Sequence, residues 1–281
     1  MHKAVIVGAG RIGAGYNWPK TPFVYTHADT YLALKDRVEL VGFVETDNDR
    51  LMAVAKKYGL ESGGGLEAML DRLQPDIISV CTPPDVRGRE EILAKLYATK
   101  CVKGIWLEKP SSIKRFSLSL AKPVQVNYIR RFEQFHVYVK ELLSAFVESD
   151  VISFNVAAKK DIHTVCHFTD LARFWGIPKH RLSYVNTLGL DYLVTEYDLL
   201  LKTERFKFAA GGEFICHFML PEASKSTPAW TDQRWNPTFM EAALSNLLDT
   251  VEGKAELTSP LSSAMKSEEW ANEILKEAGY A

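Results

Sequence analysis

Short apolar runs alternate with amphipathic segments along the first 110 residues, and this alternation constrains the fold more than any other feature of the sequence. The centres of these runs are mostly apolar, as in strands that are buried on both faces of a sheet. They lie at residues 3–7, 38–45, 76–84 and 102–110. The segments between them have helical periodicity and lie at residues 27–36, 47–59, 65–74 and 89–100. Strands and helices that alternate in this way predict an α/β fold with a doubly wound parallel sheet.

The pattern changes after residue 123, where strands begin to follow one another without a helix between them. Such consecutive strands predict a mostly antiparallel sheet. The expected strands lie at residues 123–132, 150–159 and in a block at 181–220, and the expected helices at 133–148, 163–176, 237–253 and 260–279. We therefore expect a first domain of residues 1–122 and a C-terminal α+β domain of residues 123–281, with the late helices able to pack back on the first domain.

Composition and charge narrow the classes of partner. Lysine and arginine number 34 against 35 aspartates and glutamates, a balance that does not favour nucleic acid or an anionic membrane. The cysteines form no C-x-x-C pair or disulfide framework, which predicts a reducing, cytoplasmic setting. They are Cys81, Cys101, Cys166 and Cys216. No apolar run approaches the length of a membrane span, so we expect a soluble protein.

The first apolar run ends in a glycine motif. Gly8, Gly10 and Gly13 form G-x-G-x-x-G, with Arg11 and Ile12 between the last two. In this strand-to-helix context the first glycine allows a tight turn, the second lets the backbone approach a pyrophosphate, and the third allows close packing of helix on strand. The motif predicts a Rossmann domain that binds a dinucleotide through these five residues.

An acidic residue, Glu45, ends the second apolar run, where an acceptor for ribose hydroxyls belongs. A carboxylate there would repel a 2′-phosphate, so we expect NAD in preference to NADP; NADP stays possible because Arg50 is near in sequence. An insertion rich in aromatic residues and proline, at residues 14–26, separates the glycine motif from the next helix. Because of this insertion, Glu45 lies further from the glycine motif than the usual ~20 residues.

A second candidate site follows the third and fourth runs. Ligands of open α/β sheets bind beyond the carboxyl ends of the strands, and Thr82, Pro83, Glu108 and Lys109 lie at such ends. We expect these four residues near the cofactor. A lysine held there can exchange a proton with a carbonyl or hydroxyl oxygen. The alternative is that Lys109 only pairs with Glu108 on a surface loop.

Several motifs together resemble those of the glucose-fructose oxidoreductase / inositol dehydrogenase / MocA family. They are "VIVGAGRIG", "VELVGFVETDNDRLMAVAKKYG", "CTPPD", "WLEKP", "VNYIRRF" and "HFTDLARFWG", in the family's order and rough spacing. The resemblance implies an oxidoreductase in which the lysine of E-K-P, here Lys109, lies beside the nicotinamide. It also implies that this lysine works with a histidine on a helix of the second domain.

The family pattern for that helix resembles D-x-x-x-H-x-x-D. Matched onto this chain, it makes His167 a catalytic residue and Asp170 the final acid, while His163 stands where the first aspartate is usual. The resemblance therefore implies catalytic roles for Lys109, His167 and His163, and substrate contacts from these three and Asp170. Because of the departure at His163, the group that shares the substrate's proton stays open.

We expect an NAD(P)-dependent enzyme that moves a hydride between the nicotinamide and a secondary alcohol or ketone of a sugar, nucleotide sugar or related polyol. Relative to the family, the helix after "EKPSS" is nearly absent and the loop before the histidine helix is cut to "AKKDIH". Both losses trim the walls of the expected substrate cleft. A more open cleft suits a large substrate, or a site completed in a homo-oligomer formed through the C-terminal sheet. The alternatives are a C=N or C=C reductase and a cofactor-binding sensor or scaffold without turnover. "HTVCH" lacks the glutamate of H-E-x-x-H, so we predict no metal site.

Overall fold

The computed structural model describes residues 1–16, 24–63, 65–113, 122–144, 154–157, 162–179, 182–187, 190–195, 203–210, 214–221, 239–277 and 279. The chain divides into a first unit of Met1–Phe132 with Pro237–Met265 and a second unit of Glu133–Asn236 with Lys266–Ala281. Within the described part of the chain, no helix combines the length and the apolar character that a membrane crossing needs.

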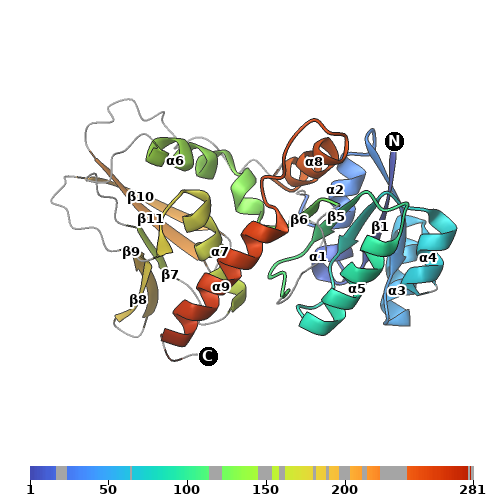
Figure 1. Cartoon of the computed structure of the whole chain (residues 1–281), viewed down its shortest axis with the longest axis horizontal. Coiled ribbons are helices and arrows are strands. Elements are labelled where there is room, and N and C mark those ends of the chain that lie inside the picture. Colours follow the sequence, from blue (N-terminus) through green and yellow to red (C-terminus); the bar gives the residue numbers. More distant parts are fainter. Residues whose placement is uncertain are drawn as a thin grey trace. The chain divides into compact units, whose positions relative to one another are not determined.

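The described strands of the first unit form a parallel sheet in the order β3-β2-β1-β4-β5-β6, of which β1, β5 and β6 are labelled in Figure 1. They are β1 (His2–Val7), β2 (Val38–Val44), β3 (Glu61–Ser62), β4 (Ile77–Val80), β5 (Gly104–Leu107) and β6 (Val124–Val126). The predicted doubly wound parallel sheet is confirmed. The strand order reverses direction between β1 and β4, and this switch point is where such sheets bind ligands.

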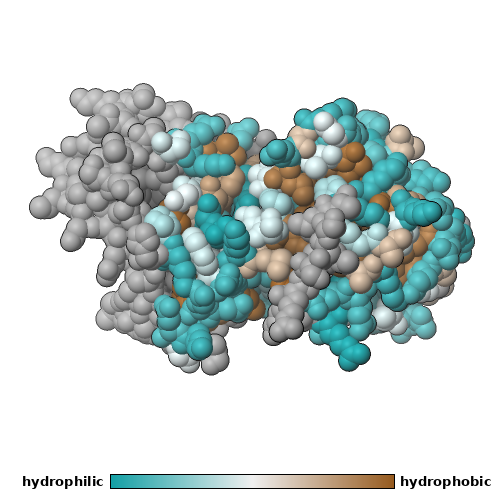
Figure 2. All heavy atoms as spheres, viewed as in Figure 1, coloured by the Kyte–Doolittle hydropathy of each residue, from teal (hydrophilic) through white to brown (hydrophobic). Residues whose placement is uncertain are grey.

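Helices connect these strands, and their ends follow local sequence signals. They are α1 (Arg11–Ala14), α2 (His27–Ala33), α3 (Asn48–Tyr58), α4 (Leu66–Leu73) and α5 (Val86–Ala98). Asp47 caps α3 by accepting a bond from the Arg50 amide at 3.0 Å, and Gly59 ends it with φ 64°. The helix after the glycine motif is only one turn long, because Gly15 ends it in the same left-handed conformation. Hydrophilic side chains dominate the visible surface around α4 (Figure 2).

The strand predicted for residues 123–132 is shorter than expected and belongs to the parallel sheet. β6 pairs with β5 and ends at Val126, and a 3-10 helix, η1 (Ile129–Phe132), follows. Arg131 in η1 is buried and donates to the Thr258 carbonyl at 2.8 Å and to Ser263 Oγ at 2.9 Å. These two contacts of Arg131 hold the 3-10 turn that follows β6 in place.

A helix from late in the chain completes the core of the first unit. The helix α8 (Phe239–Val251) contacts β5 and α2, and its apolar face is buried. The buried residues of that face are Phe239, Met240, Ala243, Leu244, Leu247 and Leu248. A Cβ on Gly104 of β5 would lie 2.7 Å from Val251 Cγ2, so the glycine permits this close approach.

The described strands of the second unit pair antiparallel in the order β10-β11-β7-β9-β8. They are β7 (Phe154–Ala157), β8 (Leu182–Thr187), β9 (Leu190–Thr195), β10 (Thr203–Ala210) and β11 (Phe214–Pro221). The helices are α6 (Gln134–Ser144), α7 (Ile162–Phe174) and α9 (Leu261–Glu277), the last of which begins in the first unit. Within the second unit, Thr169 Oγ1 of α7 donates to the Ser267 carbonyl of α9 at 2.7 Å.

Candidate active site

The glycine turn has the geometry that a dinucleotide requires. Gly8 has φ 94°, and a Cβ there would lie 2.8 Å from the Cys81 carbonyl carbon. A Cβ on Gly13 would lie 2.1 Å from the Gly8 oxygen, so both positions exclude a side chain. At Gly10 the nearest described atom to such a Cβ is Arg50 Nη1 at 4.0 Å. Gly10 therefore borders open space, and the turn fits a pyrophosphate that approaches there.

Glu45 lies against this turn. Its Oε2 accepts a bond from the Ala9 amide at 2.9 Å, and its Oε1 accepts bonds from the amides of Thr46 at 2.8 Å and Asp47 at 3.2 Å. Burial by itself raises the pKa of the carboxyl, but these amides and the Arg50 guanidinium outweigh it, so the pKa of Glu45 is lowered. An ionised carboxylate thus stands beside the turn, as a ribose site requires.

Arg50 is the cation nearest to that carboxylate among the contacts that the structure records. Its Nη1 lies 3.3 Å from Glu45 Oε2, its Nη2 lies 3.4 Å from Asp47 Oδ2, and its guanidinium lies 5.3 Å from the centre of the Tyr16 ring. Tyr16 belongs to the insertion expected at residues 14–26, of which residues 17–23 lie outside the described part of the chain. Arg11 and Ile12 belong to the single turn of α1.

The loops after β4 and β5 carry the other predicted residues. Thr82 and Pro83 follow β4, and Glu108 and Lys109 follow β5, which pairs with β4. The Lys109–Pro110 peptide is cis. Because β1, β4 and β5 are neighbours in one parallel sheet, their carboxyl ends bring the glycine turn and both loops to the same edge.

Glu108 has buried partners that the sequence analysis missed. Its Oε1 lies 2.9 Å from His27 Nε2 and accepts a hydrogen bond from Asn127 Nδ2. Burial raises the pKa of Glu108, but the bond and charge of His27, the Asn127 amide and the charge of Lys109 outweigh burial, and the pKa is lowered. These contacts argue against the alternative in which Glu108 and Lys109 form a solvent-exposed pair.

The polar network continues inward from His27, which is fully buried. Its Nδ1 lies 2.8 Å from Ser79 Oγ, and Ser79 Oγ lies 2.7 Å from the Tyr31 hydroxyl. Burial raises the pKa of Tyr31, so this hydroxyl stays protonated. The His27 ring packs 3.9 Å from that of Trp106, whose Nε1 donates to Asn127 Oδ1 at 3.1 Å. Each recorded bond satisfies a group that would be costly to bury alone.

Arg89 is the second residue missed from the sequence. It lies in the first turns of α5 and is 1% exposed. Its guanidinium donates to the carbonyls of Thr82, Glu108 and Pro110, from the loops after β4 and β5. A buried arginine in a helix otherwise rich in exposed charge has no local pattern that distinguishes it, so only the tertiary structure identifies it.

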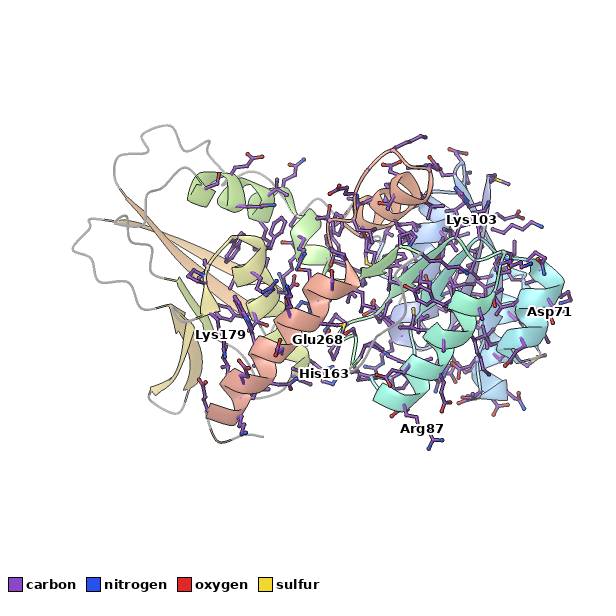
Figure 3. All side chains as sticks on the ribbon, viewed as in Figure 1. Asp71, Arg87, Lys103, His163, Lys179 and Glu268 are labelled. Atoms are coloured by element: carbon purple, nitrogen blue, oxygen red, sulfur yellow. The ribbon has the colours of Figure 1, made fainter. Side chains whose placement is uncertain are left out.

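The remaining predicted residues lie on α7 of the second unit. His163 is exposed (Figure 3), His167 is partly buried, and Asp170 is 1% exposed. Asp170 Oδ1 accepts a bond from Ser267 Oγ at 3.1 Å, so its carboxylate is engaged within its own unit. His163 and His167 are one helical turn apart and share a helix face. Their predicted cooperation with Lys109 stays a prediction.

Comparisons with known proteins agree with this geometry. Residues 2–126 match the model of an oxidoreductase family with an NAD-binding Rossmann fold, GFO_IDH_MocA. No curated protein sequence matches the chain.

Solved structures share the fold over nearly the whole chain. The WlbA dehydrogenase of Bordetella pertussis, crystallised with NADH and UDP-GlcNAcA, is 13% identical with a TM-score of 0.64 over 99% of this chain and 96% of its own. An Agrobacterium radiobacter oxidoreductase in complex with NAD+, L-tartaric acid and magnesium is 16% identical with a TM-score of 0.60 over 99% and 97%. A putative myo-inositol dehydrogenase of Sinorhizobium meliloti is 14% identical with a TM-score of 0.59 over 99% and 98%.

The family match and the glycine turn agree on the cofactor. NAD is the expected ligand of this Rossmann family, and the Gly8 turn and Glu45 have the conformation and charge that it needs. The resemblance predicted from the sequence is therefore confirmed: residues 2–126 are an NAD-binding Rossmann domain of the glucose-fructose oxidoreductase / inositol dehydrogenase / MocA oxidoreductase family.

Proposed function

We propose that this chain is an NAD-dependent dehydrogenase or reductase that acts on a secondary alcohol or ketone of a sugar, nucleotide sugar or related polyol. The observation that carries the proposal is the location of Lys109. It follows β5 at the same sheet edge as the glycine turn, on a loop whose neighbouring groups are anchored by Arg89, His27 and Asn127. A lysine there is suited to proton exchange with an oxygen whose carbon reacts at the cofactor.

The first unit supplies cofactor binding and proton transfer. The amides around Gly10 and the space beside it would hold the pyrophosphate, and Glu45 would accept bonds from ribose hydroxyls. Bound NAD supplies hydride transfer at C4 of its nicotinamide. Lys109 accepts the hydroxyl proton when the substrate is oxidised and returns it when a ketone is reduced.

The substrate class is supported by similarity alone. Structures with this fold include the Bordetella pertussis protein crystallised with UDP-GlcNAcA and the putative myo-inositol dehydrogenase. In this proposal His167 orients the substrate oxygen, His163 shares or modulates the proton, and Asp170 supports that helix face. We also propose that the chain acts as a cytoplasmic homo-oligomer formed through the second unit's sheet.

Cofactor titration followed by a turnover screen tests the proposal. NADH and NADPH binding is measured by fluorescence for the unmodified protein and for Lys109→Ala, and oxidation of UDP-sugars and polyols by NAD+ is then screened. We expect Lys109→Ala to bind NADH within a few-fold of the unmodified protein but to lose at least ~10²-fold in kcat, the usual contribution of general acid-base catalysis. Lys100→Ala, which changes an exposed lysine outside the site, is the matched control.

The outcomes separate the alternatives. If neither cofactor binds, the oxidoreductase proposal is wrong at its first step. If Lys109→Ala keeps full turnover, the lysine is not the proton-transfer group, and C=N and C=C substrates become the next screen. If NADH binds tightly and no substrate of any class turns over, the chain is a cofactor-binding sensor or scaffold.

A further inference from the structure

Arg89 is a buried cation whose recorded hydrogen bonds go to backbone oxygens of the loops around Lys109. Burying a guanidinium costs several kcal/mol unless good hydrogen bonds offset the loss of water. Here the bonds go to Glu108 O at 2.6 Å, Thr82 O at 2.5 Å and Pro110 O. Because burial of the Arg89 guanidinium is costly, we interpret its role as fixing the geometry of the loops after β4 and β5 rather than adding stability.

The location of these carbonyls explains why an arginine suits the site. The ladder between β4 and β5 ends at the pair Val80 and Leu107, so the carbonyls beyond it lack ladder partners. The planar guanidinium presents several donors in a rigid fork, which can bridge oxygens from both loops at once. A lysine ammonium is a compact charge and could reach only part of this set.

The same loop is anchored a second time on the side of Glu108. The Glu108 carboxylate is held by His27 and Asn127, and its carbonyl is held by Arg89. The next anchored carbonyl is that of Pro110. Lys109 therefore lies between two backbone carbonyls that Arg89 holds, and these contacts set its Cα–Cβ direction.

We propose that Arg89 is the positioning residue of Lys109: by joining the Thr82 loop to the backbone on both sides of Lys109, it sets the direction from which the lysine reaches the substrate oxygen. This inference rests on the proposed role of Lys109 in proton transfer. Arg89 acts through the loop and does not itself bind cofactor or substrate. Since a misplacement of about 1 Å can cost ~10²-fold in rate, loss of this fork should be visible in kcat.

The test uses two substitutions and one control on the same helix. Arg89→Lys keeps the charge but not the fork, and Arg89→Met removes both. Arg87→Met is the matched control, because Arg87 is 90% exposed, pairs with Glu91 in its own helix and points away from α5 (Figure 3). Each full-length protein is assayed for NADH affinity, for unfolding midpoint and for kcat and KM with the substrate found in the screen.

A fourth measurement follows Lys109 without turnover. The rate at which trinitrobenzenesulfonate modifies the Lys109 amine is determined against pH by peptide mass spectrometry, with and without NADH. We expect Arg89→Lys to fold and to bind NADH within about threefold of the unmodified protein. Its Lys109 modification profile should shift, and its kcat should fall ~10-fold or more with little change in KM. Arg87→Met should match the unmodified protein in every assay.

The modification profile separates this inference from the proposed function. If Arg89→Lys leaves the Lys109 profile and kcat unchanged, the positioning role is wrong even though the enzyme is active. If the profile shifts but no substrate turns over in the unmodified protein, Arg89 positions Lys109 and the proposed dehydrogenase function fails instead. If NADH affinity and unfolding midpoint fall together with kcat in Arg89→Lys, the residue is only structural and the positioning role is wrong.

Discussion

Two glutamates end strands of the same sheet, and their surroundings differ. Glu45 follows β2, and its carboxylate is held mainly by backbone amides of its own loop and of the glycine turn. Glu108 follows β5, and its carboxylate is held by the side chains of His27 and Asn127 inside the core. Both carboxyls have lowered pKa values, and in each case hydrogen bonds and nearby cations outweigh the effect of burial.

The difference indicates separate tasks for the two carboxylates. A carboxylate held by backbone amides of its own loop and of the glycine turn, close to the open space at Gly10, can exchange partners with a ligand at small cost. A carboxylate locked among buried side chains cannot, because removing it leaves its partners unpaired in a low-dielectric site. We therefore interpret Glu45 as a ligand-binding group and Glu108 as an anchor for the loop that carries Lys109.

The largest effect should follow from Glu108→Ala. It leaves His27 and Asn127 without their shared acceptor, and breaking a buried pair of this kind costs about 3–5 kcal/mol of unfolding free energy. Urea denaturation followed by circular dichroism measures the loss. Glu67→Ala removes an exposed glutamate that pairs with Lys95 and should leave the unfolding midpoint unchanged. Equal midpoints for the two variants would contradict the anchoring role of Glu108.

Acidification should remove part of the contribution that the Glu108 carboxylate makes to the free energy of unfolding. The pKa of Glu108 in the folded protein is lowered from 4.5, so the unfolded chain binds protons more readily and stability falls as pH drops below about 4.5 through the folded pKa. Above 4.5 this contribution is constant. Glu108→Gln should be less stable at neutral pH and should lose less on acidification. An acid slope that is identical in Glu108→Gln would assign the loss to the other carboxyls with lowered pKa values, which are Glu45, Glu67, Asp76 and Glu252.

A smaller effect, on binding rather than folding, is expected for Glu45→Ala. Loss of the charged acceptor for ribose hydroxyls should weaken NADH binding about tenfold, or about 1.4 kcal/mol. Discrimination against NADPH should fall as well, because the carboxylate no longer repels a 2′-phosphate. Fluorescence titration with both cofactors measures these changes. Unchanged NADH affinity together with a large loss of stability would make Glu45 an anchor like Glu108 and remove the contrast between them.

The smallest effect should come from Tyr31→Phe at the inner end of the buried network. The change removes one hydroxyl bonded to Ser79, which keeps its bond to His27, so we expect a loss of about 1 kcal/mol in unfolding free energy. Thermal or urea denaturation measures it, and NADH affinity should not change. A loss as large as that of Glu108→Ala would mean that the network acts as one cooperative unit rather than through its Glu108 end.

Much of the first unit could be predicted from local patterns. The four apolar runs match β1, β2, β4 and β5, and the Asp47 and Gly59 signals match the ends of α3. The extent of β6 and the late helix α8 in the core depended on contacts between distant segments. The sequence analysis allowed the late helices to pack back on the first domain, but it did not identify β5 as a strand that α8 contacts. An amphipathic pattern does not specify which surface covers its apolar face.

The residues of the candidate site also divide into those that local sequence patterns could locate and those that only tertiary contacts identify. The glycine motif, Glu45 and Lys109 could be located because each occurs at a strand end, and parallel sheets gather these ends at one edge. His27 and Arg89 could not, because each lies in an ordinary helix and gains its role from partners 81 and 19 residues away in sequence. The signal available for His27 was only indirect: a glutamate that ends a buried strand needs a buried partner.

The sequence by itself determined the cofactor end of this protein, because strand periodicity, glycine conformations and a carboxylate at a strand end are local properties. Only the tertiary structure decided how the Lys109 loop is held. The carbonyl of Thr82, the carboxylate of Glu108 and the donors of Arg89 and His27 come from different elements. A buried polar group is stable only where its partner is also present, and that condition is met by packing rather than by any single segment.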